Sequence, residues 1–391
     1  MTSLPIRKFD DDVAIQLGAL LWSWKLCDRC CHTREKSCQS IDCASTRLHR
    51  ARRYFNLYHT LVQDYDEASP KQTQVFKTHG DLFRAIEHLN ENPSITRSGL
   101  YDFITSSSAC SGETAMVDAT GLLVKVLAML DCSALGQYPS RIEKGISGVS
   151  WTDDTPFHKY LQDVFPTQNH PIWSSFQSDD EMLVEMKFAL RAPKLRKVLR
   201  LDFRPTHNIR NHLRLDRRRN ELQVFHFASF LKEYLRVTKT GDGVAGKSAG
   251  HLPRQLLLEV LDSTQRILFP LHDAKSRQLL GALVRSHAFD PDSLRFESSA
   301  LRGLQEESLR YVYFADRLSE LYEEVQSPQP RTWLDKQLQR HSSARYMMLT
   351  TLVGVLLALL LGVAALTVSA VQTWITYQAW KHPASQPQPA M

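Results

Sequence analysis

The sequence has no charge over one long stretch and no cysteine over most of its length. No Asp, Glu, Lys or Arg occurs in the 35 positions from Tyr346 to Trp380, and all seven cysteines lie within the first 132 residues. An odd number of irregularly spaced cysteines does not form a secreted disulfide framework. The one near-match to a glycosylation site, Asn92-Pro93-Ser94, carries the forbidden proline. These absences favour reduced thiols and a body exposed to the cytosol.

The uncharged stretch predicts a membrane span. As a helix, residues 349–371 would be long enough to cross a hydrocarbon core of about 30 Å. Residues 331–345 before it carry four basic side chains, whereas Lys381 is the single basic residue after it. Because basic residues are retained on the cytosolic side, we expect a cytosolic N-terminal domain and membrane lipids as partners.

The rest of the chain predicts an all-α fold, with one or more helical cytosolic domains before the transmembrane helix. Apolar residues recur at helical spacing in most of it, including a buried helix over 115–130 and another helix over 303–325. The predicted order is a Cys-containing segment 1–47, a helical region 48–132, a linker or long loop 133–150, a helical region 151–326, a juxtamembrane helix 327–348, the transmembrane helix 349–371 and a short tail 372–391.

One segment within the second helical region is strongly basic. Residues 191–220 hold eleven Lys and Arg against Asp202 and Asp216. Such a segment is either a solvated face paired with acidic helices or a contact for phospholipid headgroups. Apart from Phe203 it lacks the aromatic side chains on which single-stranded nucleic acid stacks. We therefore do not expect nucleic acid as a partner.

The cysteines of the N-terminal segment are the strongest candidates for metal ligands. Cys27, Cys30, Cys38 and Cys43 follow the pattern C-x2-C-x7-C-x4-C, with His32 as an alternative ligand. Four thiolates can bind zinc, but lipidation of these thiols, or no special role, agrees with the sequence as well. The pattern loosely resembles the first half of a fungal binuclear zinc cluster, from which it departs by one residue before the third cysteine and by lacking the second half. From the sequence alone we expect no metal and no metal requirement for folding.

The stretch GDGVAGKS, residues 241–248, matches the phosphate-binding P-loop formula. A P-loop needs a strand before it and a helix starting at its lysine. The preceding residues instead have a helical pattern, and Gly250 and Pro253 follow. The stretch is predicted to be a flexible loop, and a nucleotide-dependent factor or enzyme using it is the alternative function.

No catalytic residues are predicted from the sequence. It contains no recognisable Ser/His/Asp group, catalytic carboxylate pair or His-x3-His metal pattern. We therefore assign no catalytic residue and no cofactor-binding residue. We expect an interaction or scaffold protein without enzymatic activity, whose protein partner the sequence does not identify. Gly354, Ala358 and Gly362 recur at four-residue steps in the span and predict a homodimer, because small side chains let membrane helices approach closely.

Several stretches resemble a group of filamentous-fungal proteins with a single C-terminal span. The resemblance rests on HNIRNHLRLDR (207–217), LPRQLLLEVLDSTQRILFPLHDAKS (252–276), LRFESSALR (294–302) and ARYMMLTTLVG through TYQAWKHP (344–383). It implies a single-pass membrane protein of a filamentous fungus, with a role in hyphal-surface, colony or biofilm traits. It implies no active-site motif.

Overall fold

The computed structural model divides the chain into two compact units, Met1–Pro328 and Gln329–Met391. The first is the globular unit, which holds the core, and the second contains one long helix. The structure describes residues 4–28, 30, 38, 40, 42–68, 73–107, 112–132, 150–171, 173, 181–239, 252–296, 301–303, 306, 309–327 and 345–381, with side chains in the last range from Thr351 onward.

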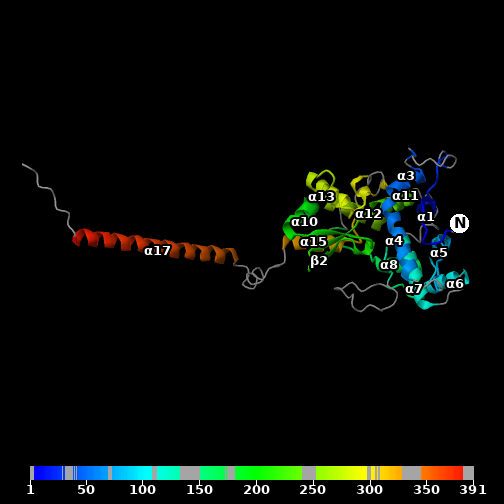
Figure 1. Ribbon diagram of the computed structural model, residues 1–391, viewed down its shortest axis with the longest axis horizontal. Helices are drawn as coiled ribbons and strands as arrows, with labels where there is room; N and C mark the ends of the chain where they lie inside the picture. Colours follow the sequence, from blue (N-terminus) through cyan, green and yellow to red (C-terminus); the bar gives the residue numbers. More distant parts are fainter. Residues whose placement is uncertain are drawn as a thin grey trace, which may run out of the picture. The chain divides into compact units, whose positions relative to one another are not determined.

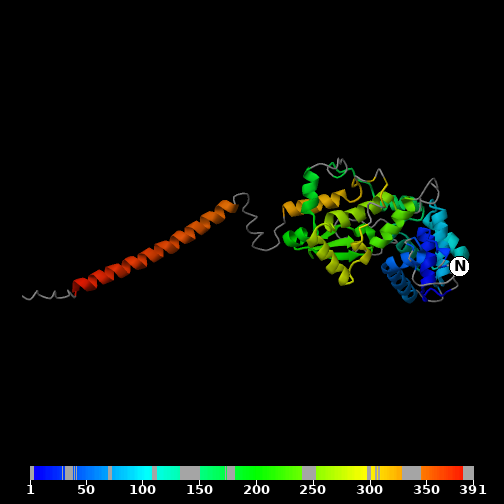
Figure 2. The same ribbon diagram turned by 90° about the horizontal axis from the view of Figure 1, so that it is seen from above.

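The first half of the globular unit is helical and lies mainly on one side of it (Figures 1 and 2). Local sequence signals set several helix ends. The carboxylate of Asp10 accepts the N–H of Val13 at the start of the first helix, and Thr78 and Asp81 form a capping box. The helices are α1 (Asp11–Trp22), α3 (Ala44–Arg50), α4 (Arg52–Ala68), α5 (His79–Glu91), α6 (Arg97–Ser107) and α7 (Glu113–Ala128).

The second half adds shorter helices and a small sheet. After α12 (Arg254–Asp262) the chain continues as a π-helical turn, Ser263–Leu268, and a 3-10 turn at Pro291–Leu294 follows α13 (Ala274–Arg285). The α-helices are α8 (Phe157–Val164), α9 (Glu181–Ala189), α10 (Ala192–Leu199), α11 (Ala228–Lys239), α12 (Arg254–Asp262), α13 (Ala274–Arg285) and α15 (Ala315–Gln326).

The sheet corrects the all-α prediction, which is right only for the helical majority of the unit. The strands are β1 (Asp202–Thr206), β2 (Arg214–Asp216) and β3 (Glu221–Phe225), in the order β1-β3-β2. β1 pairs parallel to β3, and β2 pairs antiparallel to it. Pro205 lies in the edge strand β1. Proline has no N–H to donate to a neighbouring strand, and an edge strand tolerates this better than a central strand.

Strands β1 and β2 lie in the basic segment 191–220, and β3 follows it, all within the region that we predicted to be helical. Strands of three and five residues carry too little hydrophobic alternation to stand out among the charges. Some of these charges are paired, Arg204 with Glu221 and Arg191 with Asp273. Arg217 pairs with two glutamates of α15.

Aromatic rings from three helices form the centre of the core. Trp22 of α1 contacts Tyr54 of α4 and Phe230 of α11, with ring centroids 5.1 and 6.1 Å apart. The hydroxyls of Tyr54 and Tyr234 donate to the carbonyls of Val126 and Leu127 at the end of α7. α7 is largely buried, which confirms the core helix predicted over 115–130.

The helix predicted over 303–325 is wrong in its first half, because α15 begins only at Ala315. Just before it, Glu259 of α12 accepts the backbone N–H groups of Val312, Tyr313 and Phe314 at 2.7, 2.9 and 3.1 Å. These N–H groups therefore donate to a buried carboxylate and not to the carbonyls of a preceding helical turn. A contact between residues more than 50 positions apart leaves no trace in local periodicity.

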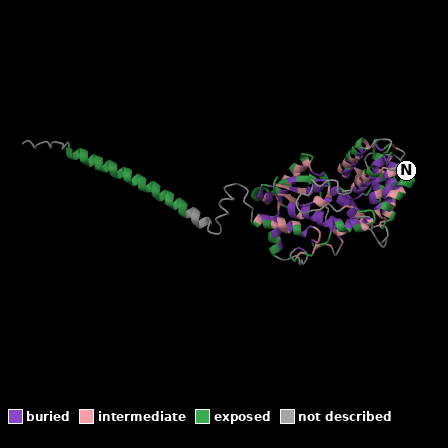
Figure 3. Ribbon diagram, turned by 90° about the horizontal axis from the view of Figure 1, so that it is seen from below, coloured by how far each residue is buried: buried purple, intermediate pink, exposed green. Residues whose placement is uncertain are grey.

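The second unit contains α17 (Arg345–Lys381). Its stretch Thr351–Lys381, 31 residues, is long and apolar enough to cross a membrane, and none of its most apolar part is buried. Figure 3 colours the residues of this stretch as exposed. The hydroxyls of Thr367, Thr373 and Thr376 donate to carbonyls three or four residues earlier, so the helix satisfies its own polar side chains there. The predicted span 349–371 lies inside α17.

Other predicted segments fall outside the described residues. These are residues 133–149 of the linker, the GDGVAGKS stretch, residues 328–344 of the juxtamembrane helix and 382–391 of the tail. The elements that flank GDGVAGKS are described: α11 ends at Lys239 and α12 begins at Arg254. A helix, and not the strand that a P-loop requires, therefore precedes the stretch.

Candidate metal centre

Four thiols of the N-terminal segment converge on one point. The Sγ atoms of Cys27, Cys30, Cys38 and Cys43 all lie within 4.8 Å of one another. Cys30 and Cys43 are buried, and the other two are partly buried. Among the described residues this is the group of His, Cys, Asp and Glu side chains arranged closely enough to hold a metal ion.

The spacing fits a tetrahedral ion better than it fits disulfides. Zinc bound at about 2.3 Å to four thiolates in a tetrahedron places the sulfurs about 3.8 Å apart. The Sγ atoms of Cys27 and Cys38 are 3.5 Å apart, far beyond the roughly 2.05 Å of a disulfide bond. All four cysteines are free thiols. An ion at the centre would have four protein ligands and no open position, which is the arrangement of a structural site.

Backbone contacts bring the last two thiols to the first two. Cys43 forms a parallel bridge with Lys25, and the N–H of Ala44 donates to the carbonyl of Lys25 at 3.0 Å. The hydroxyl of Thr46 on α3 donates to the carbonyl of Cys38 at 2.9 Å. The chain at Cys43 therefore lies beside Lys25, and α3 begins immediately after Cys43.

The thiols lie close enough to shift one another's pKa values. The pKa of Cys27 is lowered to about 7, first by the N–H of Cys30 and then by the thiol of Cys38. The pKa of Cys30 is raised well above its usual range, first by its hydrogen bond with Cys27 and then by desolvation. The N–H of Ser40 lowers the pKa of Cys38, but Cys27 and desolvation together raise it further. Cys27 therefore ionises easily, whereas ionising a second thiol costs free energy. A bound cation would remove this cost.

Charged and aromatic groups connect the centre to the core. The indole N–H of Trp24 donates to Glu233 of α11 at 2.8 Å, and Arg47 of α3 lies between Glu233 and Asp42. The Trp24 ring packs on Gly18 of α1 so closely that an added Cβ would lie 2.2 Å from it. A side chain at Gly18 would therefore push Trp24, and the cysteine segment with it, off the core.

The sequence identified these four residues but did not predict that they converge. Our expectation of no metal rested on the irregular spacing of the cysteines and on the missing second half of a known cluster. The fold brings the cysteines together through the bridge between Lys25 and Cys43. Cys31 and the alternative ligand His32 lie outside the described residues.

Within the described residues, the other predicted features do not gather into a site. Gly354 and Gly362 lie on α17, where an added Cβ would meet no atom within 4 Å. Packing among the described residues of α17 therefore does not require glycine there. Comparison of the chain with models of protein families, with curated proteins and with solved structures finds no match.

Proposed function

We propose that the protein is a membrane-anchored interaction or scaffold protein without enzymatic activity, whose cysteine segment folds around a structural zinc ion. The convergence of four thiol sulfurs within 4.8 Å carries the zinc assignment. A tetrahedral set of four thiolates suits zinc or an iron–sulfur centre, and zinc is the ion that such closed sites hold for structure alone. The ion would hold the start of α3 against Lys25.

The metal content of the full chain tests this assignment. We expect one zinc per chain after purification under reducing conditions in detergent, measured by elemental analysis. Cys38→Ser should lose the ion, whereas Cys132→Ser should keep it, because Cys132 lies outside the cluster. Metal-free wild-type protein that folds normally would refute the assignment, and visible absorption with bound iron would replace zinc by an iron centre.

The anchor in this proposal is α17. Its length and apolar surface support a span, and the basic residues before it support a cytosolic globular unit. Protease added to sealed vesicles whose cytosolic face is outward should digest the globular unit and leave a small protected fragment. Protection of the globular unit would reverse the orientation.

Self-association through the span is part of the same proposal. Gly354, Ala358 and Gly362 would lie on one helix face, and no packing among the described residues of α17 requires the two glycines. Gly354→Leu with Gly362→Leu should weaken crosslinking of the full chain in membranes, while Val355→Leu with Val363→Leu should not. Equal crosslinking in all forms would leave the helix as an anchor only.

The alternative function, a nucleotide-dependent factor, has less support because α11 precedes the GDGVAGKS stretch. Nucleotide binding that depends on Lys247, tested with Lys247→Ala, would restore it. A role in hyphal-surface, colony or biofilm traits follows from the resemblance alone and stays a prediction.

A further inference from the structure

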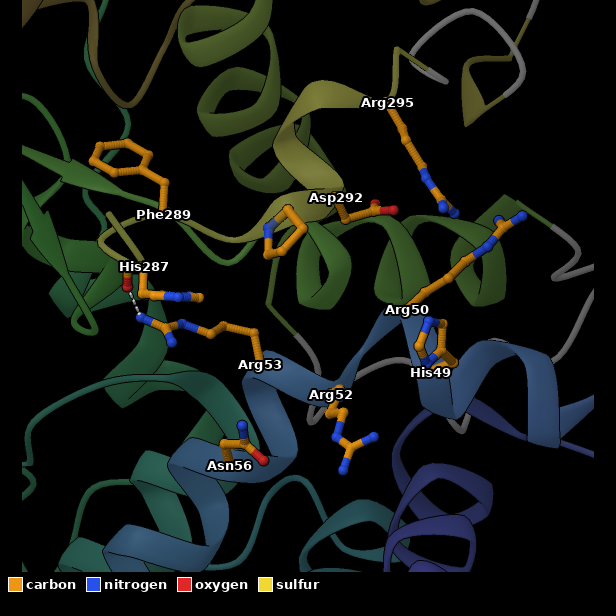
Figure 4. Close-up of a pocket in the computed structure, with 10 residues that line it drawn as sticks. His49, Arg50, Arg52, Arg53, Asn56, His287, Phe289, Asp292 and Arg295 are labelled. Carbon is orange, nitrogen blue, oxygen red and sulfur yellow. Dashed lines mark hydrogen bonds between the residues drawn. The ribbon is translucent and has the colours of Figure 1, made fainter. Parts of the chain in front are cut away.

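A second feature, distinct from the cysteine centre, is a basic cleft in the globular unit (Figure 4). It lies between the junction of α3 and α4 on one side and residues 287–295 on the other, and its volume is about 300 Å³. Six basic side chains contribute to its lining: His49, Arg50, Arg52, Arg53, His287 and Arg295. We call this site the arginine cleft.

The one carboxylate in the lining of the arginine cleft is already neutralised. Asp292 is buried and accepts a hydrogen bond from the ammonium group of Lys232 at 2.7 Å. The same ammonium group donates to the carbonyls of Asp292 and Arg295, each at 2.7 Å. Lys232 and Asp292 thus offset each other, so this carboxylate does not balance the arginines of the lining.

Within the described part of the chain, the side chains of Arg52, Arg53 and Arg295 form no ion pair with a carboxylate. Arginines elsewhere in the same unit do: Arg217 with two glutamates, Arg254 with Glu306 and Arg302 with Asp262. Gathering several like charges in one concave site costs free energy unless an anion offsets them. The positive charge of Arg52, Arg53 and Arg295 therefore indicates an anionic ligand.

Hydrogen bonds within the protein hold parts of both walls of the arginine cleft. Arg53 donates from its guanidinium group to the carbonyl of His287 (Figure 4). Asp290 accepts the N–H and the hydroxyl of Ser229, which holds the turn Pro291–Leu294 on α11. Figure 4 shows Arg50 and Arg295 reaching toward each other from opposite walls. Guanidinium groups suit phosphate, which they can bind through two parallel hydrogen bonds.

We propose that the arginine cleft binds a small ligand carrying several phosphate groups, such as an inositol polyphosphate or a phosphoinositide headgroup. A volume of about 300 Å³ lies at the lower end of small-molecule pockets. Several phosphates are needed to match several guanidinium groups. This inference does not depend on zinc or on the role proposed for α17.

Titration of the full chain in detergent tests the proposal. The probes are inositol 1,4,5-trisphosphate, dioctanoyl phosphatidylinositol 4,5-bisphosphate, and sulfate as a simple anion. We expect both phosphorylated probes to bind at least tenfold more tightly than sulfate, with affinity falling as salt rises. Tighter binding of the dioctanoyl lipid identifies a membrane headgroup, and equal binding identifies a soluble phosphate. Failure of both phosphorylated probes to bind would overturn the proposal.

Paired variants locate the binding. Arg53→Gln with Arg295→Gln should weaken binding about 100-fold, because each charged hydrogen-bond partner removed costs about a factor of ten or more. Arg218→Gln with Arg219→Gln removes the same charge from an exposed turn outside the cleft and should change binding less than twofold. Equal loss in both pairs, or no loss in the first, would overturn the proposal. Should the first pair fail to fold, Arg295→Gln alone, at an exposed residue, should still weaken binding about tenfold with unchanged thermal stability.

Discussion

Two parts of the globular unit are held in place by opposite means. In the cysteine segment, residues 27–43, four thiols of the same kind meet at one point. In the carboxylate-held segments, residues 290–296 and 309–314, each buried charge meets a partner from the chain itself. Lys232 meets Asp292, and Glu259 meets three backbone N–H groups. The carboxylate-held segments are therefore self-sufficient, whereas the thiols, once ionised, repel one another unless a cation is supplied.

Removal of metal should separate the two regions most clearly. A strong chelator with a reductant should destabilise the cysteine segment by more than about 4 kcal/mol, since a structural zinc contributes folding free energy directly. Hydrogen exchange should show faster exchange of amides in α3, while amides of residues 309–314 keep their protection. Unchanged exchange in α3 would mean that the thiols need no cation.

Breaking a pair in the carboxylate-held segments should be the next largest effect. Asp292→Ala leaves the ammonium group of Lys232 buried without its counter-charge, which we expect to cost about 3–5 kcal/mol of unfolding free energy. Glu320→Ala removes one partner of the half-exposed pair with Arg217 and should cost about 1 kcal/mol or less. Denaturant unfolding measures both. Equal costs would show that burial of the Lys232 pair has no special importance.

Glu259 tests whether a carboxylate is needed or only an acceptor. Glu259→Ala leaves three backbone N–H groups without their acceptor and should cost about 3 kcal/mol, at roughly 1 kcal/mol or more for each buried donor. Glu259→Gln keeps one acceptor oxygen, so we expect about half that loss in denaturant unfolding. The glutamine variant losing as much as the alanine variant would show that both oxygens are required. Burial raises the pKa of Glu259 despite the N–H bonds that lower it.

The smallest effect should come from protonation of His212, in the second half of the globular unit. His212 accepts the N–H of Phe225 on Nδ1 at 3.2 Å and contacts the Ser263 hydroxyl through Nε2 at 2.7 Å. A proton on Nδ1 would face the N–H of Phe225, and burial together with Arg317 lowers the His212 pKa to about 3. The unfolded chain takes up this proton near pH 6.5 and the folded chain only near pH 3.

The stability that depends on neutral His212 is therefore lost as the pH falls below about 6.5. The loss should reach about 1.4 kcal/mol per pH unit. His212→Gln, which keeps a donor and an acceptor, should flatten the change in unfolding free energy between pH 7 and 5. His49→Gln, at an exposed histidine, should leave it as in the wild type. Identical pH profiles for the two variants would exclude His212 as the titrating group.

Local signals in the sequence account for much of the helical framework. The uncharged stretch predicted the apolar helix α17, and continuous apolar spacing predicted the buried helix α7. Both predictions succeed because an apolar run or a periodic stripe is a property of neighbouring residues. The sheet was missed because its strands are short. The late start of α15 was missed because Glu259 acts on the preceding residues from more than 50 positions away.

The candidate sites divide in the same way. By itself the sequence determined which four thiols have ligand spacing and that one C-terminal helix is apolar enough to span a membrane. Only the tertiary structure decided that the thiols converge, through the bridge between Lys25 and Cys43, and that Arg53 lies beside residues 287–295. Composition and spacing are written along the chain, whereas the distance between residues hundreds of positions apart is set by the packing of the core between them.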